Sequence, residues 1–398
     1  MSHTFDTEGI DQCPFMPVFG APALSMERGS GTEVWDTDGK RYLDFLSGIA
    51  VTSLGHANPV IAEAISRQAN TLLHVSNFFT NPQATAAAVK VNELLADATG
   101  HAGQIFFTNS GAESNECALK LARKWGGRGR HTVVSAYGSF HGRTLATLAA
   151  TGQPAKHEPF APMPDGFKHV AWGDLDELRA SVDGSVAAVI IEPIQGEGGV
   201  NPAPAGYLQG IRDLCDEVGA LMIIDEIQTG FARTGRWFGF EHDGVSPDVV
   251  TLAKAMGNGM PVGACWARTE VAAVFQPGDH GSTYSGTAIA TAAVSAVIDE
   301  MRRLDAPALA TAKGARFADA LAPIPQVASV RGRGLILGAQ LAAGIDAPTV
   351  YRALLDRGLI CNAVNASTLR FLPPLTVTES ELDEAVALVA DVLAEVAP

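Results

Sequence analysis

The chain has 398 residues, of which 47% are hydrophobic, and its formal net charge is −15 at pH 7. This length suits two or three domains, and the acidic balance disfavours nucleic acid or an anionic membrane as a partner. No run of residues reaches the roughly 18 apolar residues of a membrane helix. The start, MSHTFDTEGIDQCPF, has neither a basic region nor an apolar run. We therefore expect a cytoplasmic α/β enzyme that acts on small molecules.

The cysteines are odd in number and scattered along the chain, and no two of them form a CxxC pair. Neither a disulfide framework nor a zinc site is indicated by this spacing. We expect free thiols in a reducing compartment and no metal ion. The five residues are Cys13, Cys117, Cys215, Cys265 and Cys361.

In chain order, the first predicted element is a hairpin in TEVWDTDGKRYL, with its turn at Asp38-Gly39. Next comes a strand over residues 104–108 (QIFFT), followed by a turn and a helix that begins in NSGAE. Apolar residues in this helix follow the spacing of one helical face. They are Ala118, Leu121, Ala122 and Trp125.

Four short apolar runs then predict further strands, over residues 131–137, 186–192, 220–225 and 248–253. Each run is almost continuously hydrophobic, which is typical of a parallel sheet that is buried on both faces. The segment 205–219, AGYLQGIRDLCDEVG, predicts a helix that crosses between two of these strands.

The C-terminal part has a different pattern. Residues 327–341 predict a pair of strands around a glycine-rich turn, and Thr378 and Glu381 form a capping box at the start of the last helix. We expect an N-terminal segment that packs with a small domain, a large α/β domain, and a small α+β domain. Their boundaries are residues 1–59, 60–290 and 291–398.

The apolar strand LMIID ends in two acids, Asp225 and Glu226, which are costly to bury without a cation. One hypothesis is a magnesium ion beside a nucleotide. That site requires the phosphate loop GxxxxGK[ST], whereas the only Gly-Lys pair, Gly39-Lys40, is followed by Arg41. The remaining hypothesis is a protonated nitrogen on an organic cofactor.

Lys254 follows the next apolar strand and precedes a glycine-rich loop. The carboxyl ends of neighbouring parallel strands meet at one edge, where α/β folds bind ligands. A lysine amine forms a Schiff base with the aldehyde of pyridoxal phosphate (PLP), and an acid such as Asp225 holds the ring nitrogen protonated. Residues 109–112, at a helix N-terminus, offer amides for the phosphate, although the same pattern also occurs in an ordinary capped helix.

Six segments together resemble the class III, ornithine-type, PLP-dependent aminotransferases, and the resemblance extends over nearly the whole chain. It implies a fold-type I transferase with a mostly parallel central sheet. Within this family, the compact length and the order of the motifs look most like the members that act in arginine biosynthesis, and this resemblance implies transfer of the distal amino group of N-acetylornithine to 2-oxoglutarate. The segments are NSGAESNE (109–116), SFHGRT (139–144), IIEPIQGEGG (190–199), DEIQTGFARTG (225–235), LAKAMGNGMPVGA (252–264) and HGSTYSG (280–286).

The resemblance implies roles for residues around the cofactor ring. Lys254 would carry the cofactor and later move the proton of the substrate carbon. Asp225 would pair with the ring nitrogen, Gln228 would reach the ring hydroxyl, and Phe140 would stack on the ring.

The resemblance also implies the phosphate donors. Ser110, Gly111 and Ala112 would bind the phosphate from one subunit, and Thr283 would reach it from the other. The active site would therefore need a homodimer. In HGSTYSG, Ser285 stands where the family more often has a second glycine.

For the substrates, the resemblance implies Arg143, Ser282 and Arg370 as binding residues. Glu197 would mask Arg370 while the amino donor binds and release it for 2-oxoglutarate. A guanidinium is the expected group for a carboxylate ligand.

Two alternatives stay open. The amino donor could be ornithine, succinylornithine, an acetylated lysine precursor or 4-aminobutyrate, with Phe19, Phe78 and Phe79 lining its channel. The protein could also bind PLP without transferring an amino group, as a mutase or a regulator would. The presence of two arginines with Glu197 disfavours that second alternative.

Overall fold

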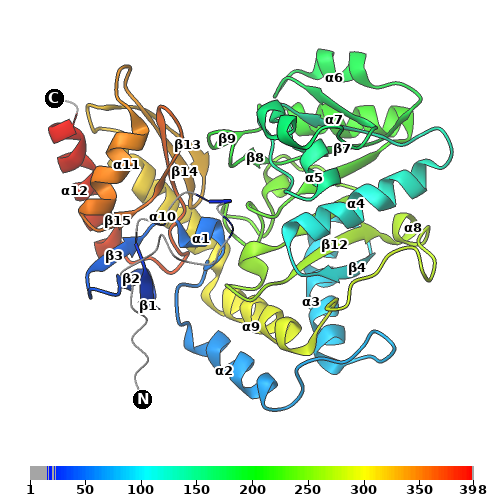
Figure 1. Ribbon diagram of the computed structural model, residues 1–398, viewed down its shortest axis with the longest axis horizontal. Coiled ribbons are helices and arrows are strands. Elements are labelled where there is room, and N and C mark those ends of the chain that lie inside the picture. The colour runs from blue at the N-terminus through cyan, green and yellow to red at the C-terminus, as the bar shows by residue number, and fades with distance from the viewer. Residues whose placement is uncertain (1–15, 17, 20–21, 23, 397–398) are drawn as a thin grey trace.

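The computed structural model describes residues 16, 18, 19, 22 and 24–396, and Figure 1 shows its layout. A seven-stranded sheet forms the centre of the larger part, with neighbouring strands in the order β4-β12-β11-β10-β7-β5-β6. Strand β12 runs antiparallel to both of its neighbours, β4 and β11, whereas all other neighbouring pairs in this sheet are parallel. The strands are β4 (Gly103–Thr108), β5 (Thr132–Ala136), β6 (Phe167–Val170), β7 (Val186–Ile191), β10 (Leu221–Asp225), β11 (Val249–Leu252) and β12 (Gly263–Arg268).

Both faces of this sheet are buried, as the apolar runs predicted. In β7 and β10, alternate residues enter two separate hydrophobic clusters, because successive side chains of a strand point to opposite faces. Val189 and Met222 pack in the cluster that contains α7, whereas Ile190 and Ile223 pack in the cluster that contains α4. The predicted parallel arrangement of β5, β7, β10 and β11 is confirmed.

Helices and short turns surround the sheet, and α9 lies in the lower centre of Figure 1, above α2, where it contacts α2 and α3. Trp125 was expected on the buried face of α4 but is 38% exposed, because it lies in the last turn of that helix. The helices are α1 (Ser47–Ala50), α2 (Pro59–Ala69), α3 (Pro82–Thr99), α4 (Gly111–Gly126), α5 (Leu145–Ala150), α6 (Leu175–Ser181), α7 (Tyr207–Val218), α8 (Thr269–Ala272) and α9 (Ala288–Leu304).

A smaller part, on the left in Figure 1, combines C-terminal and N-terminal elements. Its four-stranded sheet has the order β13-β14-β17-β16, and a second sheet has the order β1-β2-β3-β15. The elements are α10 (Ala306–Leu321), α11 (Ala347–Asp356), α12 (Glu379–Val396), β1 (Met26–Ser30), β2 (Glu33–Asp36), β3 (Arg41–Asp44), β13 (Val327–Arg333), β14 (Ile336–Leu341), β15 (Leu359–Ile360), β16 (Asn362–Asn365) and β17 (Thr368–Phe371).

Three local predictions in this part are confirmed. The turn at Gly39 joins β2 and β3 as an antiparallel hairpin, and β13 and β14 form a second hairpin. At the start of α12, the Glu381 amide donates to Thr378 Oγ1 at 3.2 Å, and the Thr378 amide donates to Glu381 Oε2 at 2.6 Å. These two bonds are the capping box.

The pairing of β15 with β3 joins the N-terminal sheet to the C-terminal part of the chain. We propose that the described residues before residue 60 belong structurally with the small domain, and that the large domain begins near residue 60. A boundary at residue 290 would cut α9, so we place the division at the C-terminal end of that helix, near Leu304. Within the described residues, no helix combines the length and the apolar character needed to cross a membrane.

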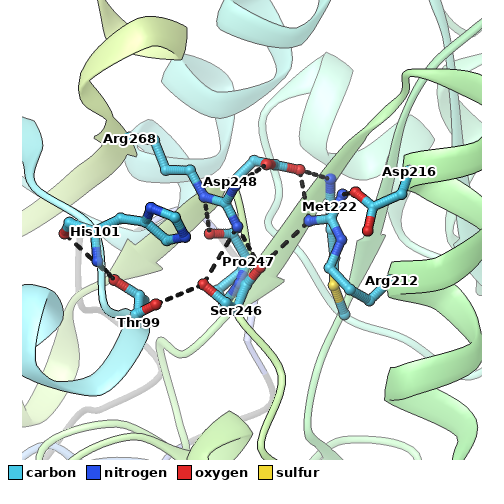
Figure 2. A network of polar contacts seen from close by, with 9 residues as sticks. All are labelled: Thr99, His101, Arg212, Asp216, Met222, Ser246, Pro247, Asp248 and Arg268. Atoms are coloured by element: carbon cyan, nitrogen blue, oxygen red, sulfur yellow. Dashed lines mark hydrogen bonds and ion pairs between the residues drawn. The ribbon is translucent and has the colours of Figure 1, made fainter.

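Figure 2 shows a charged network at the N-terminal end of β11, whereas Lys254 lies beyond the C-terminal end of the same strand. Asp248, just before β11, lies 2.8 Å from Arg212 and 3.4 Å from Arg268, and it accepts a hydrogen bond from the Met222 amide at 2.7 Å. Asp248 and Arg212 are both buried. Burial lowers the pKa of Arg212, but the Asp248 carboxylate outweighs it and leaves that pKa raised.

Replacing Asp248 by alanine is expected to destabilise the protein by about 3–5 kcal/mol, because two guanidinium groups lose their buried counter-ion. Asp216 provides the matched control: it also pairs with Arg212, at 2.7 Å, but its side chain is 66% exposed. Asp216→Ala should cost less than about 1 kcal/mol. Urea unfolding of the two variants measures the difference, and equal costs would show that the buried network adds nothing to stability.

Candidate active site

Two neighbouring strands bring a carboxylate and an amine to one edge of the central sheet. Strand β10 ends at Asp225, which pairs in register with Thr251 of β11, and Lys254 follows β11 after one intervening residue. Both Asp225 and Lys254 line a cavity of about 400 Å³. The lining includes nine of the residues singled out in the sequence: Ser110, Gly111, Ala112, Phe140, Arg143, Glu197, Asp225, Gln228 and Lys254.

Asp225 is 4% exposed and is held by three hydrogen bonds. Its Oδ2 accepts from Asn115 Nδ2 and from His141 Nδ1, both at 2.8 Å, and its Oδ1 accepts from the Ile227 amide at 3.1 Å. Asn115 also donates to the backbone carbonyl of His141 at 2.7 Å. This set of donors favours an ionised carboxylate in a fixed orientation, which suits pairing with a cationic ring nitrogen.

Lys254 is the first residue of a 3₁₀ turn and has a φ of +48°, a conformation that is rare for residues other than glycine. Such strain persists where the surrounding structure fixes it, often at functional sites. Burial lowers the pKa of Lys254 to about 8, although the nearby Glu197 and Asp225 carboxylates oppose that shift. A lower pKa gives a larger fraction of neutral, nucleophilic amine near neutral pH.

The N-terminus of α4 forms one wall of the cavity. Ser110 caps the helix by accepting a hydrogen bond from the Glu113 amide at 3.2 Å. The first N–H groups of a helix have no partner within it, so those of Gly111 and Ala112 are suited to a phosphate. A Cβ atom at Gly111 would lie 2.7 Å from Ile227 Cδ1, which explains why a residue without a side chain stands there. These features fit the phosphate of PLP.

Phe140 also borders the cavity, and two cations lie over its ring. The guanidinium carbon of Arg143 is 5.6 Å from the ring centroid, and Lys156 Nζ is 5.5 Å from it. The Phe140 amide donates to Glu192 Oε2 at 3.3 Å. Burial, followed by the Asp225 charge, raises the pKa of Glu192 well above its usual value.

Glu197 and Arg370 form an ion pair beside the cavity, with a distance of 2.5 Å. The side chain of Arg370 is fully buried, whereas that of Glu197 is 29% exposed. Gln228 links the two: its Oε1 accepts from Arg370 Nη1 at 3.2 Å, and its Nε2 donates to Glu197 Oε1 at 3.4 Å. Burial raises the pKa of Glu197, but the guanidinium outweighs this effect and leaves that pKa lowered. Arg370 Nη2 is buried without a hydrogen-bond partner among the described residues.

Three of the expected site residues do not line the cavity within this chain. Arg370 lies behind Glu197, and Ser282 Oγ accepts a hydrogen bond from Asn109 Nδ2 at 3.0 Å, beside the start of α4. Thr283 is exposed. The aromatics expected at a donor channel also lie outside the cavity lining: Phe19, Phe78 and Phe79 are 87%, 92% and 70% exposed.

Asn115, His141, Glu192 and Lys156 were not identified from the sequence. Asn115 offered a signal, since it lies three residues before Ala118 and therefore on the buried face of α4, where a polar side chain needs a partner. Nothing in the spacing indicated the other three.

Glu226, the second acid after β10, faces away from the cavity. It accepts hydrogen bonds from Thr229 Oγ1 at 2.6 Å and from the amides of Gly239 and Phe240, both at 2.9 Å. Burial raises the pKa of Glu226 to about 7. The two adjacent acids therefore have different surroundings: Asp225 lines the cavity, and Glu226 fixes a loop.

Comparison with known proteins supports this chemistry. The chain is 48% identical over 389 residues to acetylornithine aminotransferase of Corynebacterium efficiens, covering 95% of this chain and 94% of the relative. It is 44% identical over 390 residues to the acetylornithine aminotransferase of Caldanaerobacter subterraneus subsp. tengcongensis, covering 96% and 97%.

Solved structures agree. N-acetylornithine aminotransferase from Stenotrophomonas maltophilia matches with a TM-score of 0.82 and 34% identity, covering 94% of this chain and 96% of that one. Ornithine aminotransferase from Toxoplasma gondii, with PLP at partial occupancy in its active site, matches with a TM-score of 0.89 and 32% identity, covering 96% and 92%. The model of the aminotransferase class-III family matches residues 18–393. The chain therefore belongs to the class III aminotransferases, PLP-dependent enzymes of fold type I.

Proposed function

We propose that the enzyme transfers the distal amino group of N2-acetyl-L-ornithine to 2-oxoglutarate. The products are N-acetyl-L-glutamate 5-semialdehyde and L-glutamate, and the two substrates use one site in turn. The observation that carries this proposal is the Glu197–Arg370 pair beside Lys254, since a removable mask over a buried guanidinium is useful only where two differently shaped substrates alternate. The names of the relatives at 44–48% identity support the same donor.

We propose that Lys254 holds the cofactor covalently and that Asp225 keeps its ring nitrogen protonated. When bound, PLP supplies a sink for the electrons that remain when the substrate carbon loses its proton. Once the substrate amine has displaced it from the cofactor, the free Lys254 amine would take up the proton of the substrate carbon and act as the acid that later donates it. His141 and Asn115 hold the Asp225 carboxylate in a fixed orientation through their bonds at 2.8 Å.

The remaining cavity residues hold the cofactor in place. In this proposal the amides of Gly111 and Ala112, with Ser110, bind the phosphate, and Phe140 packs against the ring. Gln228 reaches the ring hydroxyl. Because Gln228 also contacts both Glu197 and Arg370, it connects the cofactor with the substrate switch.

We propose that two arginines, Arg143 and Arg370, bind the carboxylates of the two substrates. Arg143 is exposed at the cavity and, in this proposal, binds the carboxylate of acetylornithine that is far from the reacting amine. Ser282, which lies outside the lining of this cavity, is proposed as a further substrate-binding residue. Arg370 binds the carboxylate next to the reacting carbon of 2-oxoglutarate. Its unpartnered Nη2 leaves one further donor for that carboxylate once Glu197 has moved.

A panel of amino donors with 2-oxoglutarate tests the proposed substrate. Glutamate formation is measured with N-acetylornithine, ornithine, succinylornithine, an acetylated lysine precursor and 4-aminobutyrate. N-acetylornithine should give the highest kcat/KM. A higher kcat/KM for another donor would support the transamination reaction but contradict N-acetylornithine as the substrate. If no donor yields glutamate, the protein binds PLP without transferring amino groups.

Glu197→Ala is expected to raise the reactivity of glutamate as an amino donor relative to acetylornithine. Without the mask, Arg370 is always available to a carboxylate next to the reacting carbon, and its unpaired charge is unfavourable while acetylornithine is bound. The rates of the two half-reactions should be measured separately from the absorbance of the cofactor. The exposed Glu270→Ala provides the control and should leave the ratio unchanged. An unchanged ratio in Glu197→Ala would show that Glu197 has only a structural role.

We further propose a homodimer with shared active sites. The segments around residues 72–79 and 282–287 lie side by side: Asn77 Nδ2 donates to the Ser282 carbonyl at 2.9 Å, and Thr287 Oγ1 donates to the Leu73 carbonyl at 2.8 Å. Together they expose large apolar side chains, which mark an interaction surface. These are Leu72, Leu73, Phe78, Phe79 and Tyr284.

Thr283 lies in this exposed region, and we propose that it binds the phosphate in the neighbouring subunit. Lys254→Ala and Thr283→Ala proteins should each be impaired, and mixing them should restore activity because hybrid dimers contain one site with both residues intact. Native mass spectrometry establishes that subunits have exchanged. Exchange without any gain in activity would contradict the trans arrangement.

We propose that the enzyme works in the cytoplasm. The four cysteines within the described residues are free thiols, which suits a reducing compartment.

A further inference from the structure

A second cavity, of about 200 Å³, lies between α4, β4, β12 and α8, and shares no lining residue with the cavity of Lys254. It contains two thiols, Cys117 of α4 and Cys265 of β12. Both residues are buried in the hydrophobic cluster on the α4 face of the sheet. Apart from Gln104, the other lining residues are apolar: Ile105, Phe106, Leu121, Ala267, Ala272 and Phe275.

A cationic edge borders this cavity. The ring of His280 lies 4.8 Å from that of Phe106, and Lys120 Nζ contacts His280 Nδ1 at 3.0 Å while donating to the Asp279 carbonyl at 2.7 Å. Cys265 and His280 both lie close enough to Cys117 to influence the pKa of its thiol.

These surroundings separate Cys117 from the other described cysteines. The hydrogen bond from Cys265, against the effect of burial and with further help from His280, lowers the pKa of Cys117 to about 6. The same bond raises the pKa of Cys265 well above its usual value. Burial raises the pKa values of Cys215 and Cys361 to about 12. Cys117 is therefore the more readily ionised thiol of the pair and Cys265 the less readily ionised one, an asymmetry that suits an attacking and a resolving cysteine.

We propose that Cys117 and Cys265 are a redox-sensitive thiol pair that a small peroxide converts into a disulfide. The Cys117 thiolate attacks one oxygen of hydrogen peroxide; with one proton taken up, the step gives a sulfenic acid and one water. The Cys265 thiol then attacks the sulfenic sulfur, and a second water leaves as the S–S bond forms. Two thiols are thus oxidised by two electrons, and one peroxide is reduced to two waters.

The position of the pair connects this oxidation to catalysis. Cys117 lies two residues after Asn115, which holds Asp225, and on the helix whose first turn borders the catalytic cavity. A disulfide between Cys117 and Cys265 would join α4 covalently to β12 and restrict the movement of this helix. Oxidation is therefore expected to lower activity without modifying Lys254, whichever amino donor the enzyme takes.

The test uses the PLP-loaded enzyme with Cys13→Ser, because Cys13 lies outside the described residues. After treatment with hydrogen peroxide, free thiols are alkylated under denaturing conditions and the protein is digested without reduction. Mass spectrometry should find the Cys117 and Cys265 peptides joined, with Cys215 and Cys361 alkylated as internal controls. Activity should fall in parallel with this linkage and return with dithiothreitol. If the Cys117–Cys265 disulfide forms and activity does not fall, the proposed effect of this oxidation on catalysis is wrong. If the linked peptide is absent, the proposed disulfide between Cys117 and Cys265 is wrong. The same conclusion follows if Cys117 is oxidised only to a sulfinic acid.

Two further measurements identify the roles within the pair. In Cys265→Ser, peroxide should leave Cys117 as a sulfenic acid that dimedone traps, and trapping at another cysteine would contradict the assignment. If that variant does not fold, the native protein is alkylated with iodoacetamide across a pH series. Cys117 should react with a midpoint near pH 6 and at least tenfold faster at neutral pH than Cys215 or Cys361. Equal rates would overturn the proposal.

Discussion

Lys254→Ala is expected to lower transamination by about 10³-fold or more, the scale on which a proton-transferring group is lost. The variant has neither the amine that attaches to the cofactor aldehyde nor the base that moves the substrate proton. Lys254→Arg should be as inactive, because a guanidinium keeps the positive charge but remains protonated and cannot attack the aldehyde. Single-turnover rates with saturating PLP measure both variants, and Lys168→Ala on the surface is the control. Substantial activity in Lys254→Arg would show that charge, rather than the amine, is what the site needs.

The pH dependence of cofactor attachment follows from the same residue. Because burial lowers the pKa of Lys254 to about 8, the neutral amine is a minor species at pH 7 and becomes dominant above pH 8. Attachment of PLP to the apo-enzyme should therefore accelerate as the pH rises and level off above that value. A midpoint near the ordinary lysine pKa of 10.5 would contradict the inferred effect of burial.

Asp225→Asn should retain the cofactor and lose activity by about 10²- to 10³-fold, the scale for removing one preorganised electrostatic partner of a reacting centre. The amide is nearly isosteric with the carboxylate but has no negative charge to keep the ring nitrogen protonated. Asp216→Asn, at an exposed aspartate of α7, is the control. Cofactor occupancy and half-reaction rates should be measured on the same samples. Unchanged turnover at full occupancy would rule out the assigned role of Asp225.

The central arrangement could be predicted from the sequence because it depends on local patterns. Uninterrupted apolar runs indicated strands that are buried on both faces, and the residues that end these runs, Asp225 and Lys254, then had to lie at one edge of the sheet. The structure pairs β10 with β11 in parallel, as this logic requires. Strand β12 was not predicted, because an antiparallel strand between β4 and β11 has no signature in its own residues.

The partners of Asp225 could not be deduced in the same way. Asn115 and His141 are separated from it by 110 and 84 residues, and only the fold brings their side chains within 2.8 Å of its carboxylate. The Glu197–Arg370 pair spans 173 residues and came from family resemblance rather than from spacing. The thiol pair required the packing of α4 against β12, which no cysteine spacing indicates.

The assignment of the Lys254 cavity as the active site depends most directly on covalent attachment of PLP to Lys254. Reduction of the purified enzyme with borohydride fixes the cofactor to its lysine, and peptide mapping by mass spectrometry then locates the pyridoxyl group. We expect a single pyridoxyl label, at Lys254, and we expect this label to be absent from the Lys254→Arg variant. A label on Lys120, Lys124 or another lysine would contradict the assignment of this cavity as the active site.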